Sequence, residues 1–192
     1  MNSREVALII IFVALTIALD PLRIPSMYLI GSYYRFCEIP IVAAFLLFGP
    51  KVGVSVAVLN LAAETMLYPG QPGVTVGRPF VLLLTLSMLL GLHLAQKFLK
   101  RRNLQGKPLG KRTGLYFTVF GAFTRTALVP IVLFPFYRYV LPLVWISFSD
   151  IQVIALMPLL MFYALTFSLY TIPIGYLIAR TISRNLKIGN EL

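Results

Sequence analysis

A few polar side chains interrupt long apolar stretches of this chain, and these are the positions where binding or chemistry could occur. Asn60 and Glu64 are four residues apart in the stretch 51–68, so a helix there places both on one face. Arg78 opens the next apolar stretch, and Arg125 lies well inside a later one. An ionisable group at membrane depth costs roughly 3 kcal/mol or more, so such groups normally face an interior cavity and a partner.

Two interpretations of these residues are open: a ligand site and a set of structural ion pairs. Asp150 and Gln152, which open the last apolar stretch, belong to the same set. As a ligand site, all six residues bind a small molecule. As ion pairs, Glu64 joins Arg78 and Arg125 joins Asp150. Ligand binding is favoured for Arg78 and Glu64, and for Arg125 both interpretations stand. Because guanidinium groups bind carboxylates in bidentate geometry, the site predicts an anionic ligand.

The chain lacks the residues of a hydrolytic or metal enzyme. One histidine, His93, and one cysteine, Cys37, do not make a nucleophile–base pair or a zinc site. The stretch 106–113 (GKPLGKRT) is one residue short of a phosphate-binding loop, and Arg112 replaces the magnesium-binding hydroxyl. We therefore expect no catalytic residues, no metal, no cofactor and no ATP site in this chain.

Composition and charge indicate an integral membrane protein. Hydrophobic residues make up 59% of the 192 positions and charged residues only 12%. Most positive charges fall at alternate ends of the apolar stretches: Arg4, Lys51, Lys97, Lys100, Arg101, Arg102, Lys107, Lys111, Arg112, Arg180, Arg184 and Lys187. Because cytoplasmic loops carry excess Lys and Arg, both termini are predicted to be cytoplasmic, in a multi-pass protein of a prokaryotic plasma membrane. The net charge of +11 therefore faces anionic lipid headgroups and not nucleic acid.

The predicted fold is an all-α bundle of six transmembrane helices, formed by residues 1–192 as a single substrate-binding domain. The expected spans are 6–19, 38–48, 51–68, 78–98, 114–137 and 150–180. The segment 20–35 is expected to be an ordered outer loop that packs on the bundle, and 99–113 a basic cytoplasmic connection. The last span is longer than the hydrocarbon core, so it either starts flat on the outer face or protrudes and bends at Pro158 or Pro173.

A pair of small residues marks the first span. Ala14 and Ala18 lie one helical turn apart, and such faces let helix backbones approach closely. Packing inside the bundle and contact with a partner subunit are both open.

The stretch CEIPIVAAFLLFGPKVGVSVAVLNLAAE (37–64) resembles the second and third helices of the substrate-binding S-components of energy-coupling factor (ECF) transporters. The resemblance rests on an acidic residue with Ile-Pro at 38–40 and on Gly-Pro-Lys at 49–51, followed by Gly53. The Ala14/Ala18 pair matches an alanine motif of the same family. Length and the six predicted spans agree with it over the whole chain.

The resemblance implies a capture subunit that binds a vitamin-like micronutrient on its outer side. A transmembrane coupling subunit and two cytoplasmic ATPases would be its partners, with the alanine face as the coupling contact. The pocket would be formed by 20–35 together with Asn60, Glu64, Arg78, Arg125, Asp150 and Gln152. A stand-alone transporter that carries protons on Glu64 or Asp150 is the main alternative, and a small intramembrane enzyme or a structural membrane protein is a further one.

Overall fold

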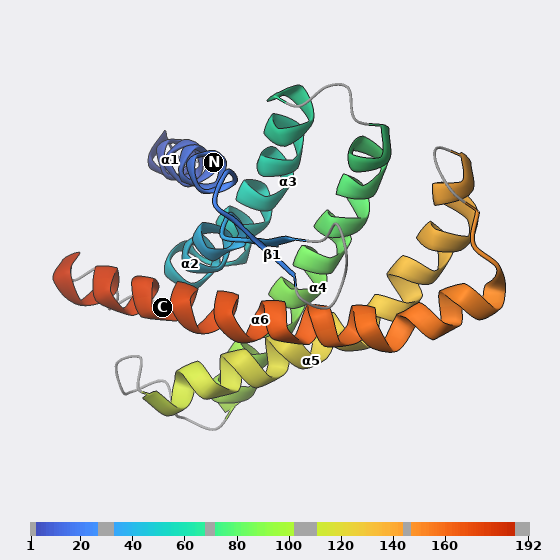
Figure 1. Ribbon diagram of the computed structural model, residues 1–192. Helices are drawn as coiled ribbons and strands as arrows, with labels where there is room; N and C mark the ends of the chain where they lie inside the picture. The colour runs from blue at the N-terminus through green and yellow to red at the C-terminus, as the bar shows by residue number, and fades with distance from the viewer. Residues whose placement is uncertain (1–2, 27–32, 68–71, 102–110, 144–146, 187–192) are drawn as a thin grey trace.

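The computed structural model describes residues 3–26, 33–67, 72–101, 111–143 and 147–186, and these parts are almost entirely helical (Figure 1). The helices of the described parts are α1 (Ser3–Leu19), α2 (Glu38–Phe48), α3 (Pro50–Leu67), α4 (Pro72–Arg101), α5 (Lys111–Pro135) and α6 (Asp150–Leu186). A π-helical turn η2 (Phe136–Val140) and a 3-10 turn η3 (Leu141–Leu143) extend α5. Two short strands, β1 (Arg23–Pro25) and β2 (Tyr33–Arg35), pair antiparallel between α1 and α2. The predicted all-α fold is therefore confirmed apart from this small hairpin.

The sharp turn between α2 and α3 depends on its glycines and proline. Gly49 adopts a φ of +89°, a conformation that only glycine enters without strain, and Pro50 then starts α3 where no helical N–H is needed. One turn later, a side chain at Gly53 would place its Cβ 2.5 Å from the Cβ of Phe45. The missing side chain thus lets α3 fold back closely against α2.

The core of the molecule is centred on α2, which is buried along nearly its whole length. It packs against α1, α3 and α6. At the contact with α6, a Cβ at Gly175 would lie 2.7 Å from Val42, so the glycine allows the two helices to touch. This burial explains why the run 38–48 is apolar without the periodicity of a surface helix.

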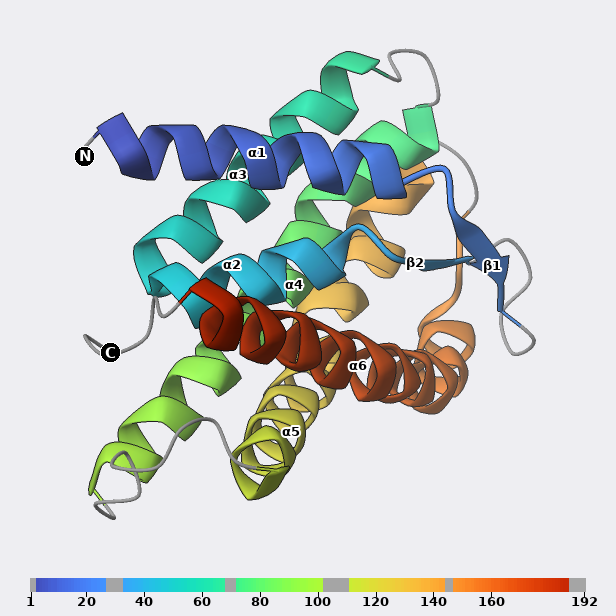
Figure 2. The same ribbon diagram turned by 90° about the vertical axis from the view of Figure 1, so that its left-hand side faces the viewer.

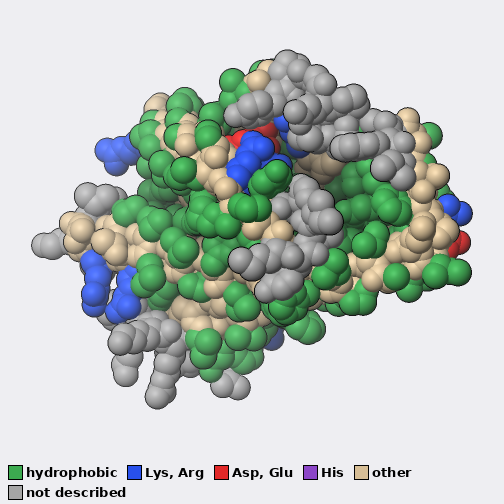
Figure 3. All heavy atoms as spheres, in the orientation of Figure 1, with side chains coloured by type: hydrophobic (Ala, Val, Ile, Leu, Met, Phe, Trp, Pro, Cys, Tyr) green, Lys and Arg blue, Asp and Glu red, His purple; other side chains and the backbone are tan. Residues whose placement is uncertain are grey.

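Large apolar side chains cover much of the outside of the molecule. Phe123 is 71% exposed, Ile10 62% and Ile154 60%, and Figure 3 shows hydrophobic side chains over most of one face. Soluble proteins rarely expose apolar surface on this scale, whereas lipid tails solvate it. The exposed surface therefore supports a location in a membrane.

Within the described residues, three helical segments are long and apolar enough to cross a membrane: Val76–Arg101, Thr113–Leu143 and Asp150–Asn185. In contrast, α2 has 11 residues and is about 16 Å long at 1.5 Å per residue, half of the hydrocarbon core. The six-span count and the cytoplasmic termini therefore stay predictions. Figure 2 shows the start of α1, the α2–α3 turn and the end of α6 toward one side, with the β1–β2 hairpin on the other.

The course of the last apolar tract relative to the membrane stays an open question. α6 is one continuous helix of 37 residues, about 55 Å long, and both Pro158 and Pro173 lie inside it. Of the predicted basic connection 99–113, residues 102–110 lie outside the described residues. The predicted partner residues Ala14 and Ala18 are both exposed on the surface of α1, so neither packs inside this bundle.

Candidate ligand-binding site

A cavity of about 520 Å³ lies between the hairpin and helices α2–α6, which is within the usual size range of small-molecule sites. Its polar lining consists of Arg35, Cys37, Glu38, Asn60, Glu64, Arg78, Thr85 and Arg125. Its aromatic lining consists of Tyr33, Phe80, Phe136, Tyr137, Phe148, Tyr163 and Phe167. The cavity thus combines apolar surface with a few convergent polar groups, the composition expected of a binding site for an organic molecule.

Asn60 and Glu64 of α3 both line the cavity and are hydrogen-bonded to each other. Both are 7% exposed, and the Nδ2 of Asn60 donates a hydrogen bond of 2.8 Å to Oε1 of Glu64. Their spacing of four residues puts them on the same face of the helix, as the sequence predicts. The hydrogen bond holds the carboxylate in one orientation at the cavity wall.

Arg35 reaches the same carboxylate from the hairpin. Its Nη1 lies 3.5 Å from Oε2 of Glu64 and 3.8 Å from Oδ1 of Asp20. Asp20 in turn accepts a 2.7 Å hydrogen bond from Arg23, which stands opposite Arg35 in the β1–β2 register. The carboxylate of Asp20 therefore pairs with both Arg23 and Arg35 and stabilises the base of the hairpin.

The side chains of Asp20, Cys37 and Glu64 come within 4.8 Å of one another, a spacing that could suit a metal ion. However, Arg35 contacts both carboxylates and supplies the positive charge that a cation would bring. Burial, together with the negative charge of Glu38, raises the pKa of the Cys37 thiol, so sulfur is not offered as a thiolate ligand. We therefore describe this cluster as a salt-bridge group and not as a metal centre.

Arg125 is held deep in the bundle by Glu38, the first residue of α2. Its Nη1 and Nη2 lie 2.5 Å and 3.1 Å from the two carboxylate oxygens, and both residues are nearly fully buried. Thr85 of α4 donates a further 3.0 Å hydrogen bond to the same carboxylate, and the guanidinium stacks 4.4 Å above the ring of Phe167 of α6. This arrangement joins α2, α4, α5 and α6 at one end of the cavity lining.

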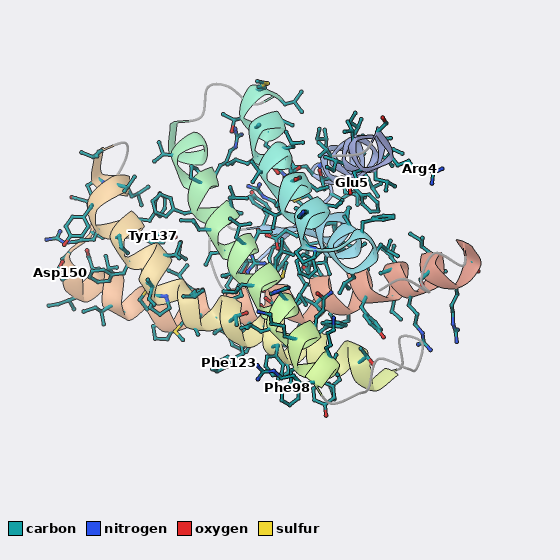
Figure 4. The ribbon with its side chains drawn as sticks, turned by 180° about the vertical axis from the view of Figure 1, so that it is seen from behind. Arg4, Glu5, Phe98, Phe123, Tyr137 and Asp150 are labelled. Atoms are coloured by element: carbon teal, nitrogen blue, oxygen red, sulfur yellow. The ribbon has the colours of Figure 1, made fainter. Side chains whose placement is uncertain are left out.

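An aromatic wall is formed by different elements. The ring centroids of Phe80 (α4) and Phe136 (η2) are 4.5 Å apart. The centroid of Tyr137 lies 5.3 Å from that of Phe136 and 6.0 Å from that of Phe148. Figure 4 shows Tyr137 directed from η2 toward α4. Aromatic rings at these separations make a surface on which a flat, apolar molecule can pack.

Three hydrogen bonds hold the hairpin against α6. Tyr163 and Tyr170 donate hydrogen bonds of 2.6 Å and 2.9 Å to the backbone carbonyls of Tyr33 and Arg35. Between them, the hydroxyl of Tyr34 lies 2.8 Å from that of Thr166. Positions 163, 166 and 170 share one helix face, so β2 runs along α6. The expectation that this segment packs on the bundle is confirmed for the described part of 20–35, and its position on the outer side stays a prediction.

Four of the six predicted site residues line this cavity: Asn60, Glu64, Arg78 and Arg125. Asp150 and Gln152 are not in the lining. Asp150 lies at the edge of the molecule (Figure 4), where its largely exposed side chain pairs with Arg138. Gln152 is exposed and accepts a 2.9 Å hydrogen bond from the backbone N–H of Ser149, next to the helix start.

The predicted pairing of Arg125 with Asp150 is wrong. Arg125 pairs with Glu38 and not with Asp150, because Asp150 begins α6 at the far edge, away from the middle of α5. The ion-pair partner of Glu64 is Arg35, while Arg78 contributes a favourable electrostatic interaction with Glu64. Arg78 itself is 5% exposed and lines the cavity.

One charged residue of the lining, Glu38, was missed as a site residue, because the sequence marked it only as the first residue of the span 38–48. Arg35 belongs to the segment 20–35 that the resemblance includes in the pocket. The available signal was that Glu38 opens the most apolar helix of the chain, where an acidic group must be paired. The pair Tyr163 and Phe167, four residues apart on α6, gave no signal beyond that of a lipid-facing or buried face.

Comparison with known proteins identifies the fold. No family model and no curated protein matches the sequence. The structure is similar to a solved structure of the S component of a bacterial ECF transporter, with a TM-score of 0.68, 17% sequence identity, and coverage of 97% of this chain and 99% of that chain. Because both chains are covered almost completely, the likeness extends over the whole fold. The resemblance inferred from the sequence is confirmed: this chain has the S-component fold.

Proposed function

We propose that this protein is the membrane-embedded capture subunit of an ATP-driven micronutrient transporter. It binds a vitamin-like small molecule in the cavity between the hairpin and α2–α6. A transmembrane coupling subunit and two ATPases use ATP to deliver the molecule inward. The protein itself is not an enzyme.

The observation that carries this proposal is a cavity of about 520 Å³ inside a chain with the S-component fold. Its polar and aromatic lining comes from five helices and the hairpin, so the site depends on the complete fold. A structural membrane protein has no need of buried, convergent polar groups, since each is costly to place in an apolar interior.

The lining also supports an anionic group on the ligand. It contains three arginines (Arg35, Arg78, Arg125) and two carboxylates (Glu38, Glu64), a formal sum of +1 when all are ionised. Arg78 is 5% exposed and lines the cavity, and its planar guanidinium suits a bidentate contact, so we assign it to a carboxylate or similar group of the ligand.

The test is native mass spectrometry of the protein purified in mild detergent, which identifies any small molecule that stays bound. Gly77→Phe fills the cavity, because a Cβ at Gly77 meets only the ring edge of Phe136 at 3.7 Å and the added ring can point into the open space. This variant should fold and lose the bound molecule. Ala62→Phe, at an exposed position of α3, is the matched control and should keep it.

Uptake measurements separate the capture subunit from a stand-alone proton-coupled carrier. Cells that produce this chain alone should bind the identified molecule without accumulating it, and accumulation should require the ATPases. Accumulation by the chain alone, driven by a proton gradient and lost in Glu64→Gln, would favour the carrier. Absence of any retained or titratable small molecule would contradict both.

A further inference from the structure

A second hollow lies outside the ligand cavity, between the first turns of α1 and α3. It is an open groove of about 470 Å³, lined by Glu5 and Ile9 of α1 and by five residues of 50–55 in α3. None of these residues lines the ligand cavity. The starts of both helices lie toward the same side of the molecule (Figure 2), so the groove lies at that end of the structure.

Apolar side chains form most of this groove. Ile9 and Val52 are only 3% and 5% exposed and belong to the hydrophobic core, whereas Val54 is 38% exposed. The groove therefore has a buried apolar floor and an edge that faces the surroundings. In a membrane those surroundings are lipid tails, and a hydrocarbon chain matches an apolar trough of this kind.

Two opposite charges lie in the groove lining, one on each helix. Glu5 is in the first turn of α1, and Lys51 is the second residue of α3. Lys51 is exposed, and no hydrogen bond or ion pair joins it to any residue that the structure describes. The N-terminal end of α3 adds positive potential beside its ammonium group. The groove thus offers one cation and one anion next to apolar surface, which is complementary to a zwitterion with a hydrocarbon chain.

The groove lies on a different face of α1 from the predicted partner residues. At about 100° per residue, Ala14 is about 140° and Ala18 about 180° around the helix from Ile9. Both alanines are exposed, while Ile9 is buried under the groove. A subunit bound to the alanine face would therefore leave the groove accessible. Membrane lipid is present around the chain with or without such a subunit.

We propose that this groove binds one molecule of phosphatidylethanolamine, a phospholipid that carries both a phosphate and a primary ammonium group. One acyl chain packs on Ile9, Val52 and Val54. The phosphate accepts hydrogen bonds from the ammonium of Lys51, and the headgroup ammonium donates to the carboxylate of Glu5. Phosphatidylglycerol has no cation for Glu5, and phosphatidylcholine has no N–H group to donate. The site is separate from the ligand cavity and does not depend on the proposed function.

Native mass spectrometry of the delipidated protein in detergent tests the headgroup. The protein is titrated with phosphatidylethanolamine, phosphatidylcholine and phosphatidylglycerol that carry identical acyl chains. We expect phosphatidylethanolamine to bind about three- to tenfold more tightly than either other lipid, because it alone satisfies both charges. Glu5→Gln should reduce this preference to about twofold or less. Asp150→Asn, which removes an exposed carboxylate outside the groove, should keep it.

A second pair of variants tests the groove itself. Val54→Trp places a large ring in the trough and should weaken binding of all three lipids by roughly tenfold or more. Because Val54 is partly exposed, the larger side chain does not have to enter the core. Val119→Trp is the matched control: Val119 is 56% exposed on α5 and lines neither the groove nor the ligand cavity, so binding should not change.

Three results would overturn the inference: equal affinities for the three lipids, tighter binding of phosphatidylglycerol, or lipid binding that survives Val54→Trp. The comparison of the lipids on the unchanged protein needs no variant, so a misfolded variant would not prevent the test. A retained transport substrate differs in mass from a phospholipid, so the same spectra keep this outcome distinct from that of the capture function.

Discussion

Removal of the Arg125 side-chain charge should destabilise this protein more than removal of the Arg138 charge, which pairs with Asp150 at the edge of the molecule. Arg125 is 3% exposed and Glu38 4%, and both guanidinium nitrogens that face the carboxylate lie within 3.1 Å of it. Arg125→Met keeps the apolar stem above Phe167 but leaves Glu38 buried without its cation. Breaking a buried pair in this way costs about 3–5 kcal/mol. At about 2–4 °C per kcal/mol for a chain of this size, the unfolding midpoint should fall by roughly 6–20 °C.

Thermal unfolding in detergent, followed by circular dichroism at 222 nm, measures this change. Arg138→Met is the control, because its pair with Asp150 is partly exposed and such pairs contribute only about 0–1 kcal/mol. The double variant Glu38→Leu with Arg125→Met should recover much of the loss, since it removes both charges and leaves apolar groups. A midpoint for Arg125→Met no lower than that of Arg138→Met would refute the structural role of the pair. Weakened ligand binding without lost stability would assign Arg125 to the ligand instead.

Other consequences concern the hairpin, the surface of α1 and the cysteine. Tyr170→Phe removes one hydrogen bond to β2 and should weaken ligand binding about two- to twelvefold in titration, whereas an unchanged affinity would mean that the hairpin does not contribute to the site. Ala14→Trp, on the exposed face of α1, should leave binding intact and abolish ATP-dependent uptake; loss of both together would count against a partner surface there. Cys37 is 3% exposed and burial raises the pKa of its thiol, so the folded protein should resist iodoacetamide at pH 8 and react once unfolded. Rapid labelling of the folded protein would contradict the buried position.

Local spacing predicted the part of the site that lies on one helix. Asn60 and Glu64 share a face because they are four residues apart, and the structure places both in the cavity wall. Arg78 and Arg125 stood out because charges in apolar runs must face an interior. These inferences needed only helical periodicity and the cost of burying charge.

The partners of those charges could not be predicted in the same way. Glu38 and Arg125 are 87 residues apart, and nothing local indicates that α2 and α5 meet at those positions. Asp150 was assigned to the site because it opens an apolar tract, but the first residue of a long helix can project beyond the bundle, as it does here. The strands of the hairpin are only three residues each, too short for an alternating pattern to show.

Titration of the purified single chain with its retained small molecule is the most direct test of the central claim. The account predicts saturable binding of one molecule per chain in the absence of ATP and of any partner subunit. It also predicts that Gly77→Phe abolishes this binding while Ala62→Phe preserves it. Binding that appears only when the ATPases are present, or that Gly77→Phe leaves unchanged, would contradict capture in this cavity.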